Sequence, residues 1–328
     1  MVIYMIDLSV VIPIRNEAPS LDELHCELTE TLGAWGRPYE IIVVDDGSTD
    51  ESFAILARLQ ASDAHLRIIR FRRNFGKTAA LSAAFAHVRG RMIVTFDGDL
   101  QMDPRDIPVL VKRLEDGGLD IVSGWRRQRQ DAFVSRSLPS IVANRLISWA
   151  TGVRLHDYGC SLKVFRTEVA KSLRLYGEMH RFIPAIASEE GVAIAEAVVN
   201  HRPRKHGRSN YGLWRIVCVV LDLLTVKFLL RYSTRPLQIF GLVGLGMALP
   251  GVLITLYLAF AKSIMAQSIA NRPLLLFGIL FVMSGVQLLT FGLLAELQVR
   301  THHELSYKPT YVIRELSESP ALDAPAAS

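Results

Sequence analysis

Two long stretches without a charged residue constrain this 328-residue chain more than any other feature. They run from Pro236 to Ala261 and from Pro273 to Ala295. Each exceeds the roughly 20 apolar residues that an α-helix needs to cross a bilayer. A buried core helix is the alternative, but core helices of this length normally carry a polar stripe. The sequence therefore predicts two membrane spans, at 236–261 and 273–297, joined as a hairpin within residues 236–299.

The flanks of these stretches predict how the hairpin is oriented. Basic residues precede the first stretch, follow the second, and are fewer in the loop between them: Lys227, Arg231 and Arg235, then Arg300, Lys308 and Arg314, against Lys262 and Arg272. Because basic residues accumulate on the cytoplasmic side, we expect the loop outside and both termini in the cytoplasm.

The first 125 residues alternate short apolar runs with amphipathic segments. The runs predict strands at Leu8–Ile14, Glu40–Val44, Leu66–Phe71, Met92–Phe96 and Asp120–Ser123. The segments between them predict helices at Ser20–Leu32, Asp50–Leu59, Thr78–Val88 and Asp106–Leu114, the first opened by a capping box at Ser20-x-x-Glu23. Such alternation predicts an α/β domain with a mostly parallel sheet, which we place at residues 1–211.

Acidic residues directly follow two of these strands. Asp45 and Asp46 come after the second, and Asp97 and Asp99 flank Gly98 after the fourth. Parallel sheets bind ligands beyond the carboxyl ends of their strands. Two hard oxygen ligands there suit a divalent cation carrying a diphosphate. On an extended backbone Asp97 and Asp99 would point the same way, and Gly98 would let a ligand approach closely.

Other segments have ordinary structural interpretations. A turn and a helix cap account for Ser48 or Asp50, although not for the paired acids before them. Phe75-Gly76-Lys77-Thr78 is no phosphate-binding P-loop, because Phe71 stands where that motif needs glycine. Gly241-x-x-Gly244-x-Gly246 lies inside a predicted span, where glycines indicate helix packing.

Charge and composition restrict the partners. The formal net charge is +5, and the basic residues concentrate at 67–73, 126–136, 202–208 and the flanks of the spans. No nucleic-acid-binding signature accompanies them, so we expect anionic lipid and phosphate ligands and no nucleic acid. The three cysteines are widely spaced and form neither a metal pattern nor a disulfide framework.

The segments around the hairpin are predicted from their polarity. Residues 212–235 are apolar but too charged to span, which suits an amphipathic helix lying in the membrane interface. A helix packed on the preceding domain is the alternative. Residues 300–328 form a cytoplasmic tail, and Glu315 to Ser328, rich in Pro, Ala and Ser, is predicted to be disordered.

Short motifs also recur in order through residues 8 to 300. They are Val11-Ile12-Pro13 with Asn16-Glu17, Val44-Asp45-Asp46-Gly47-Ser48-x-Asp50, Arg73-Asn74-Phe75-Gly76-Lys77, Asp97-Gly98-Asp99-Leu100-Gln101-x-x-Pro104, Gly124-Trp125-Arg126, Asp157-Tyr158-Gly159-Cys160, Phe182-Ile183-Pro184, His201-Arg202-Pro203-Arg204 and Gly207-Arg208-Ser209-Asn210-Tyr211. The set resembles glycosyltransferase family 2, in its polyprenyl-phosphate glycosyltransferase branch. The resemblance implies a GT-A (Rossmann-like) domain, interfacial helices and a two-helix transmembrane hairpin in the inner (cytoplasmic) membrane. Lys77-Thr78 and Asn210 depart from the usual residues, which leaves the sugar open.

The resemblance also implies roles for single residues. The nucleotide sugar would be bound by Pro13, Asn16, Glu17, Asp45, Asp46, Lys77, Asp97 and Gln101. A Mg²⁺ or Mn²⁺ ion would be held by Asp97 and Asp99. The lipid phosphate would be bound by Arg126, Arg136, Ser140 and, from a β-hairpin, Arg202. The catalytic residues would be Asp97, Asp99, Arg126 and Asp157.

The implied reaction is inverting attack of a polyprenyl monophosphate oxygen on the anomeric carbon of a UDP- or GDP-linked sugar. The lipid-linked product would serve an envelope glycan or lipid A modification. A phosphate monoester loses its second proton near pH 6, so the attacking oxygen needs little help from a base. Asp157 is therefore either a base or, as the pKa argument favours, a group that orients an arginine.

Two alternative functions differ from this one in what they require. A processive polysaccharide synthase would need more spans and a Gln-x-x-Arg-Trp motif, and the sequence has neither. A membrane scaffold or lipid-transport partner with a vestigial enzyme domain is opposed by the intact acids, and two spans make a poor pore. Small residues in the spans are compatible with a homo-oligomer.

Overall fold

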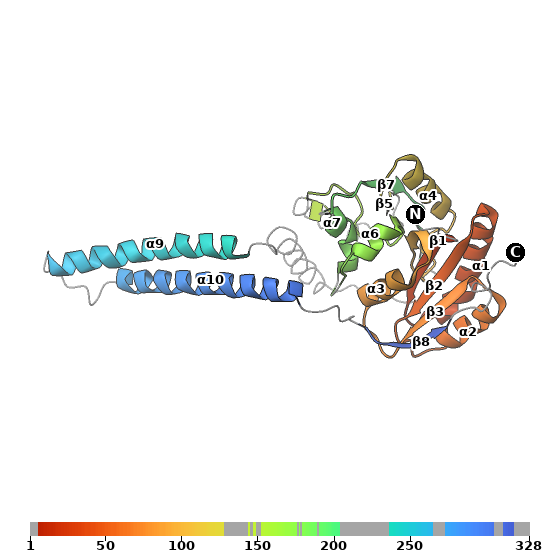
Figure 1. The fold of residues 1–328 in the computed structure, drawn as a ribbon, viewed down its shortest axis with the longest axis horizontal. Helices are drawn as coiled ribbons and strands as arrows, with labels where there is room; N and C mark the ends of the chain where they lie inside the picture. Colours follow the sequence, from red (N-terminus) through yellow and green to blue (C-terminus); the bar gives the residue numbers. More distant parts are fainter. Residues whose placement is uncertain are drawn as a thin grey trace. The chain divides into compact units, whose positions relative to one another are not determined.

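A computed structural model describes residues 6–127, 144, 147–148, 152–175, 177, 179–188, 190–203, 236–264, 273–304 and 311–317. The chain forms two compact units, and each is described by itself. The first contains the sheet with its helices, and the second contains helices α9 and α10 (Figure 1). The predicted interfacial helix at 212–235 lies outside the described residues.

In the described part of the first unit, eight strands form one sheet in the order β7-β5-β6-β4-β1-β2-β3-β8. The strands are β1 (Ile6–Ile14), β2 (Tyr39–Asp45), β3 (Leu66–Phe71), β4 (Gly90–Thr95), β5 (Ile121–Trp125), β6 (Lys163–Arg166), β7 (Ile194–Val198) and β8 (Ile313–Ser317). Only β6 and β8 run antiparallel to their neighbours. The predicted α/β class and mostly parallel sheet are confirmed; β6, β7 and β8 were not predicted.

The helices α1 to α4 lie where the amphipathic pattern predicts them, whereas the three short helices that follow were not predicted. In chain order these helices are α1 (Ala18–Trp35), α2 (Ser52–Ser62), α3 (Lys77–His87), α4 (Asp106–Asp116), α6 (Thr167–Ser172), the 3₁₀ helix η2 (Met179–Arg181) and α7 (Ile183–Ser188). On α1 the leucines at 21, 24, 28 and 32 are buried in the main core, because this spacing aligns them on one face.

The start of α1 differs from the prediction. The helix begins at Ala18, two residues before the expected cap, and its N-cap residue Glu17 makes no capping bond with its side chain. The capping box at Ser20 is therefore wrong. The hydroxyl of Ser20 instead lies 2.8 Å from the carbonyl oxygen of Gly98. This bond joins the first turn of α1 to the loop after β4.

Strand β1 marks the point where the chain changes direction across the sheet. It pairs in parallel with β2 on one side and with β4 on the other. The loops that leave the carboxyl ends of β1 and β4 therefore diverge, which is where parallel sheets bind ligands. The loops after β1, β2 and β4 all open on this edge.

Strand β8 corrects the prediction for the tail. It pairs antiparallel with β3, with Ile68 opposite Ser317 and Phe71 opposite Ile313. The prediction of disorder is wrong for Glu315 to Ser317, because the free edge of β3 supplies backbone partners that composition cannot reveal. The rest of that stretch lies outside the described residues.

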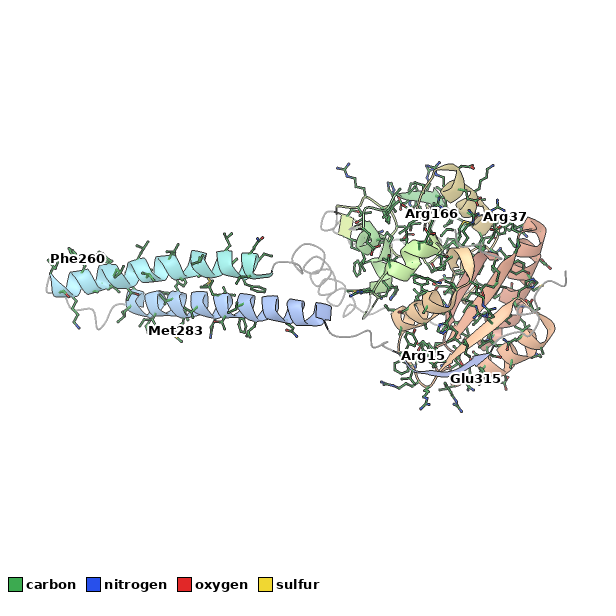
Figure 2. All side chains as sticks on the ribbon, in the orientation of Figure 1. Arg15, Arg37, Arg166, Phe260, Met283 and Glu315 are labelled. Atoms are coloured by element: carbon green, nitrogen blue, oxygen red, sulfur yellow. The ribbon has the colours of Figure 1, made fainter. Side chains whose placement is uncertain are left out.

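The second unit is a pair of helices, α9 (Pro236–Ser263) and α10 (Pro273–Glu304), lying side by side. Both are long and apolar enough to cross a membrane. Only 17% and 11% of the residues in their most apolar stretches of 18 residues are buried. Phe260 and Met283 are 51% and 59% exposed (Figure 2). Such exposure is typical of helices that cross a membrane and unlike that of core helices in a soluble protein.

Glycines set the spacing of the two helices. A Cβ atom at Gly285 would lie 2.6 Å from the carbonyl oxygen of Gly244, and one at Gly251 would lie 2.7 Å from the amide of Val282. The expected packing role is thus met at Gly244 inside the hairpin. These glycines therefore give no support to association between chains.

Candidate active site

The turn after β2 is fastened to the loop after β1. The amide of Asn16 donates to Ser48 Oγ (3.0 Å), and Asn16 Oδ1 accepts from the amide of Thr49 (2.8 Å). Asp45, at the end of β2, accepts from the amide of Ser48 (2.8 Å). The structure thus brings Asn16 and Asp45 into one set of hydrogen bonds. Pro13 lies within β1, opposite Val44 of β2.

The segment Phe75–Lys77 links the two acidic clusters. The amides of Phe75 and Gly76 donate to the carboxylate of Asp46 at 2.7 and 2.9 Å. The next residue, Lys77, places its Nζ 2.5 Å from Asp97 Oδ1. Burial raises the pKa of Asp46 despite its two hydrogen bonds. The acids that follow β2 and β4 are therefore connected through three consecutive residues.

The loop after β4 does not have the expected shape. Strand β4 ends at Thr95 and the backbone turns at Gly98, so the premise of an extended Asp97-Gly98-Asp99 segment is wrong. A Cβ atom at Gly98 would lie 2.9 Å from Ile14 Cγ2. The glycine therefore packs tightly against the Ile14 side chain of β1.

Asp97 and Asp99 offer hard oxygen atoms at this edge. Burial raises the pKa of Asp97, but the Lys77 ammonium outweighs it and keeps this pKa below its ordinary value. Asp99 Oδ1 accepts from the amide of Gln101 (3.2 Å). Among the described residues no group of three His, Cys, Asp or Glu side chains could hold a metal ion. Two carboxylates, completed by diphosphate oxygens and water, nevertheless fit Mg²⁺ or Mn²⁺.

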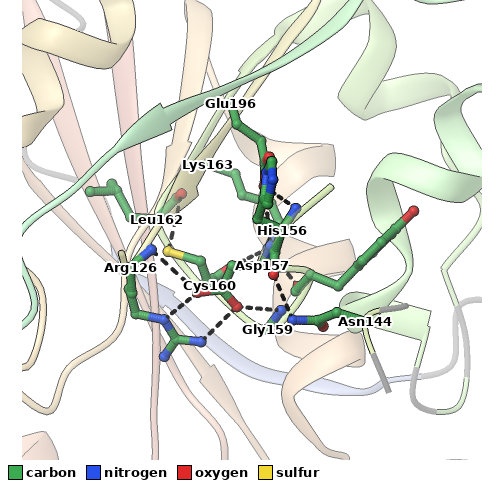
Figure 3. A network of polar contacts seen from close by, with 10 residues as sticks. Arg126, Asn144, His156, Asp157, Gly159, Cys160, Leu162, Lys163 and Glu196 are labelled. Atoms are coloured by element: carbon green, nitrogen blue, oxygen red, sulfur yellow. Dashed lines mark hydrogen bonds and ion pairs between the residues drawn. The ribbon is translucent and has the colours of Figure 1, made fainter. Parts of the chain in front are cut away.

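A buried ion pair stands at the end of β5. Arg126 Nε and Nη2 donate to the Asp157 carboxylate at 2.7 and 3.0 Å, and the amide of Gly159 donates to it at 3.1 Å (Figure 3). Burial lowers the pKa of Arg126, but Asp157 raises it above its ordinary value. Two parallel bonds fix the plane of the guanidinium.

The loop that carries Asp157 is held in place by side chains of β7 and β6. Glu196 on β7 accepts from the amides of His156 (2.8 Å) and Asp157 (3.1 Å). Lys163 Nζ donates to the carbonyl oxygens of Cys160 and Tyr158 (Figure 3). Burial lowers the pKa of Lys163 to about 8. Neither Glu196 nor Lys163 was predicted, because neither belongs to a motif.

Arg202 lies beside the Gln101 loop. Its amide donates to the carbonyl oxygen of Gln101 (2.8 Å), and its guanidinium contacts Glu27 (2.7 Å) and Asp103 (3.0 Å). Met102, which follows Gln101, and His201, which precedes Arg202, are joined by an isolated antiparallel bridge. The predicted lipid-phosphate ligands Arg136 and Ser140 lie outside the described residues.

His180, in η2, is a site neighbour that the sequence did not indicate. Its Nδ1 lies 2.8 Å from Thr78 Oγ1, on the residue after Lys77. Burial and the charges of Lys77 and Arg181 lower the pKa of His180 to about 3. The imidazole is therefore neutral at physiological pH and holds the start of α3.

This lowered pKa predicts a pH-dependent contribution to stability. Above pH 6.5 the neutral His180 makes its full contribution to the free energy of unfolding. This contribution is lost as the pH falls toward 3, because the histidine takes up its proton in the unfolded chain before it does so in the folded protein. Between pH 6.5 and 5 the wild type should lose about 2 kcal/mol relative to His180→Asn. Urea unfolding at several pH values checks this, with the more exposed His65→Asn as control. A wild-type–variant difference that does not change with pH would contradict the assignment.

Sequence segments distinguish members of the resembled branch. Arg129-Gln130-Asp131, Asp157-Tyr158-Gly159-Cys160 and Phe182-Ile183-Pro184 resemble undecaprenyl-phosphate 4-deoxy-4-formamido-L-arabinose transferase. The resemblance to dolichyl-phosphate mannose synthase is weaker.

Comparison with known structures establishes the fold. Glucosyl-3-phosphoglycerate synthase from Mycobacterium tuberculosis superposes with a TM-score of 0.53 at 22% identity, covering 68% of this chain and 79% of that chain. The likeness agrees with a GT-A fold.

Comparison with known sequences establishes the family. Dodecaprenyl-phosphate galacturonate synthase of Rhizobium johnstonii is 44% identical over 95% of this chain and 93% of its own length. Undecaprenyl-phosphate 4-deoxy-4-formamido-L-arabinose transferase of Pseudomonas aeruginosa is 37% identical over 99% of this chain and 94% of its own length. The profile of Glycosyl transferase family 2 matches residues 9–174. The chain therefore belongs to glycosyltransferase family 2.

Proposed function

We propose that this protein transfers a sugar, with inversion, from a nucleotide sugar to a polyprenyl monophosphate at the cytoplasmic face of the inner membrane. One observation carries the proposal: enzymes named for polyprenyl-phosphate acceptors align with 95% and 99% of the chain, its apolar hairpin included. The lipid-linked sugar would serve an envelope glycan or lipid A modification.

The donor would bind at the edge where β1, β2 and β4 end. Asp45 and Asp46 would hold the nucleoside and Lys77 the diphosphate, with Pro13, Asn16, Glu17 and Gln101 around them. Asp97 and Asp99 would hold Mg²⁺ or Mn²⁺, and the structurally similar glucosyl-3-phosphoglycerate synthase has been solved with Mn²⁺ and UDP-glucose. Such an ion stabilises the charge that develops on a departing diphosphate.

The acceptor would bind through arginines. Arg126, held rigid by Asp157, would present a fixed guanidinium to the lipid phosphate, assisted by Arg136, Ser140 and Arg202. Because the acceptor phosphate is already an anion at neutral pH, these residues position it and no base is required. The helix pair, together with an interfacial helix at 212–235, would hold the enzyme at the depth of the lipid headgroups.

A donor panel tests the proposal. The purified full chain would be incubated with undecaprenyl phosphate, Mg²⁺ or Mn²⁺, and UDP- and GDP-linked sugars. UDP-linked galacturonate and 4-deoxy-4-formamido-L-arabinose should be included because of the two relatives. We expect a single glycolipid, detected by mass spectrometry, that EDTA abolishes and added metal restores. Absence of product from every donor would contradict the function and favour a non-catalytic scaffold.

A further inference from the structure

Strand β8 comes from the end of the chain, after the apolar hairpin, yet it completes the edge of the sheet beside β3. The amide of Arg72 donates to the carbonyl oxygen of Val312 (3.3 Å), which extends the pairing into the loop after β3. At the other end, Gln60 Nε2 donates to the Ser317 carbonyl oxygen (3.0 Å). The strand is thus held at one end by the loop after β3 and at the other by α2.

A row of aromatic rings leads from this segment to Asp46. Tyr311, two residues before β8, stacks on Phe71 with 5.4 Å between ring centroids and 13° between planes. Phe71 meets Phe75 edge-on at 5.6 Å and 88°. The amide of Phe75 is one of the two that bind the Asp46 carboxylate. Any shift of the Tyr311 ring therefore reaches Asp46 through two ring contacts.

Charged residues also connect β8 to Asp45. Glu315 lies opposite Arg70 in the strand register. The guanidinium carbon of Arg70 lies 3.7 Å from the ring centroid of Phe53, and Arg70 Nε lies 3.7 Å from Asp45 Oδ2. Opposite charges facing each other across neighbouring strands stabilise that register. Both acids assigned to the nucleoside therefore depend on residues that β8 contacts.

We infer that β8 and Tyr311 form a positioning element of the donor site. They set the loop from Phe71 to Gly76 so that Asp45 and Asp46 are held for a nucleoside diphosphate. The inference rests on the proposed function only in placing the nucleotide at these two acids. It makes donor binding dependent on a segment that follows the apolar hairpin.

Nucleotide binding tests this inference on the full chain. Isothermal titration with UDP and with GDP, in the presence of MnCl₂, gives the Kd of the preferred nucleotide. In Tyr311→Ala we expect this Kd to rise about fivefold, the size of an aromatic-pair contribution. Tyr311→Phe keeps the ring and should restore the wild-type Kd. The KM for undecaprenyl phosphate should not change, because Arg126 and Asp157 lie at a different strand end.

Controls separate positioning from general stability. Arg314→Ala removes an exposed side chain of β8 and should leave the Kd unchanged. Tyr311→Leu fills the volume without a ring and replaces the alanine variant if that one does not fold. A lowered melting temperature with an unaltered Kd in both ring-lacking variants would overturn the inference. Normal nucleotide binding without glycolipid in the donor panel would refute the proposed function alone. A wild type that binds neither nucleotide would overturn the donor-site assignment and this inference together.

Discussion

Asp99→Asn is expected to lower the rate of sugar transfer about 10³-fold, because metal stabilisation of the leaving diphosphate is worth several kcal/mol. The substitution is nearly isosteric and keeps Oδ1, which accepts from the amide of Gln101. The fold should therefore survive while one anionic metal ligand is lost. Initial rates of glycolipid formation, measured against Mn²⁺ concentration, give the effect.

Asp99 is a cleaner probe of the metal site than Asp97. The Asp97 carboxylate lies 2.5 Å from the Lys77 ammonium, so its replacement would also release that side chain. Asp22→Asn is the matched control, since it makes the same change on the exposed face of α1, where the side chain is 58% exposed. Full transfer by Asp99→Asn with metal present would show that this carboxylate is not part of the catalytic site.

Much of the first unit could be predicted because its central strands are unbroken apolar runs. The opening run predicts β1 at Leu8–Ile14, and the structure extends it only to Ile6. The strands β6, β7 and β8 are short and carry charged residues, so no apolar run as long as that of β1 marks them. In β6 the charged ends Lys163 and Arg166 enclose only two apolar residues. The pairing that buries such charges joins distant strands, as between Arg67 and Glu40 (2.6 Å), and local patterns cannot show it.

The candidate site was predictable to a similar depth. A general rule of parallel sheets places ligand-binding residues at strand ends, and that rule selects Asp45, Asp46 and Asp97. Their support was not predictable. Glu196 and His180 come from segments far along the chain and carry no local signature, so only the fold shows which loops they hold. The same holds for Tyr311, beyond the hairpin.

Asp157→Asn is expected to lower kcat/KM for the polyprenyl phosphate about 10²-fold, because removing one partner of a buried ion pair costs about 3 kcal/mol or more. The loss should appear mainly in the KM for the acceptor, since the amide can no longer accept both bonds from Arg126. Arg126→Met should cause a loss of similar size. In the double variant the two losses should not multiply, because both remove the same interaction.

The pH profile of these variants distinguishes an orienting group from a base. If Asp157 orients Arg126, kcat/KM falls as pH drops below about 6 in the wild type and in Asp157→Asn alike, because the acceptor phosphate itself takes up the proton. If Asp157 were the base, it could take the proton from the monoanionic acceptor, so the acidic limb would lie at lower pH in the wild type than in Asp157→Asn. The bidentate contact at 2.7 and 3.0 Å, together with the buried position of the carboxylate, favours the first result. An acidic limb that lies at higher pH in Asp157→Asn than in the wild type, or losses that multiply in the double variant, would instead show that Asp157 acts on the acceptor directly.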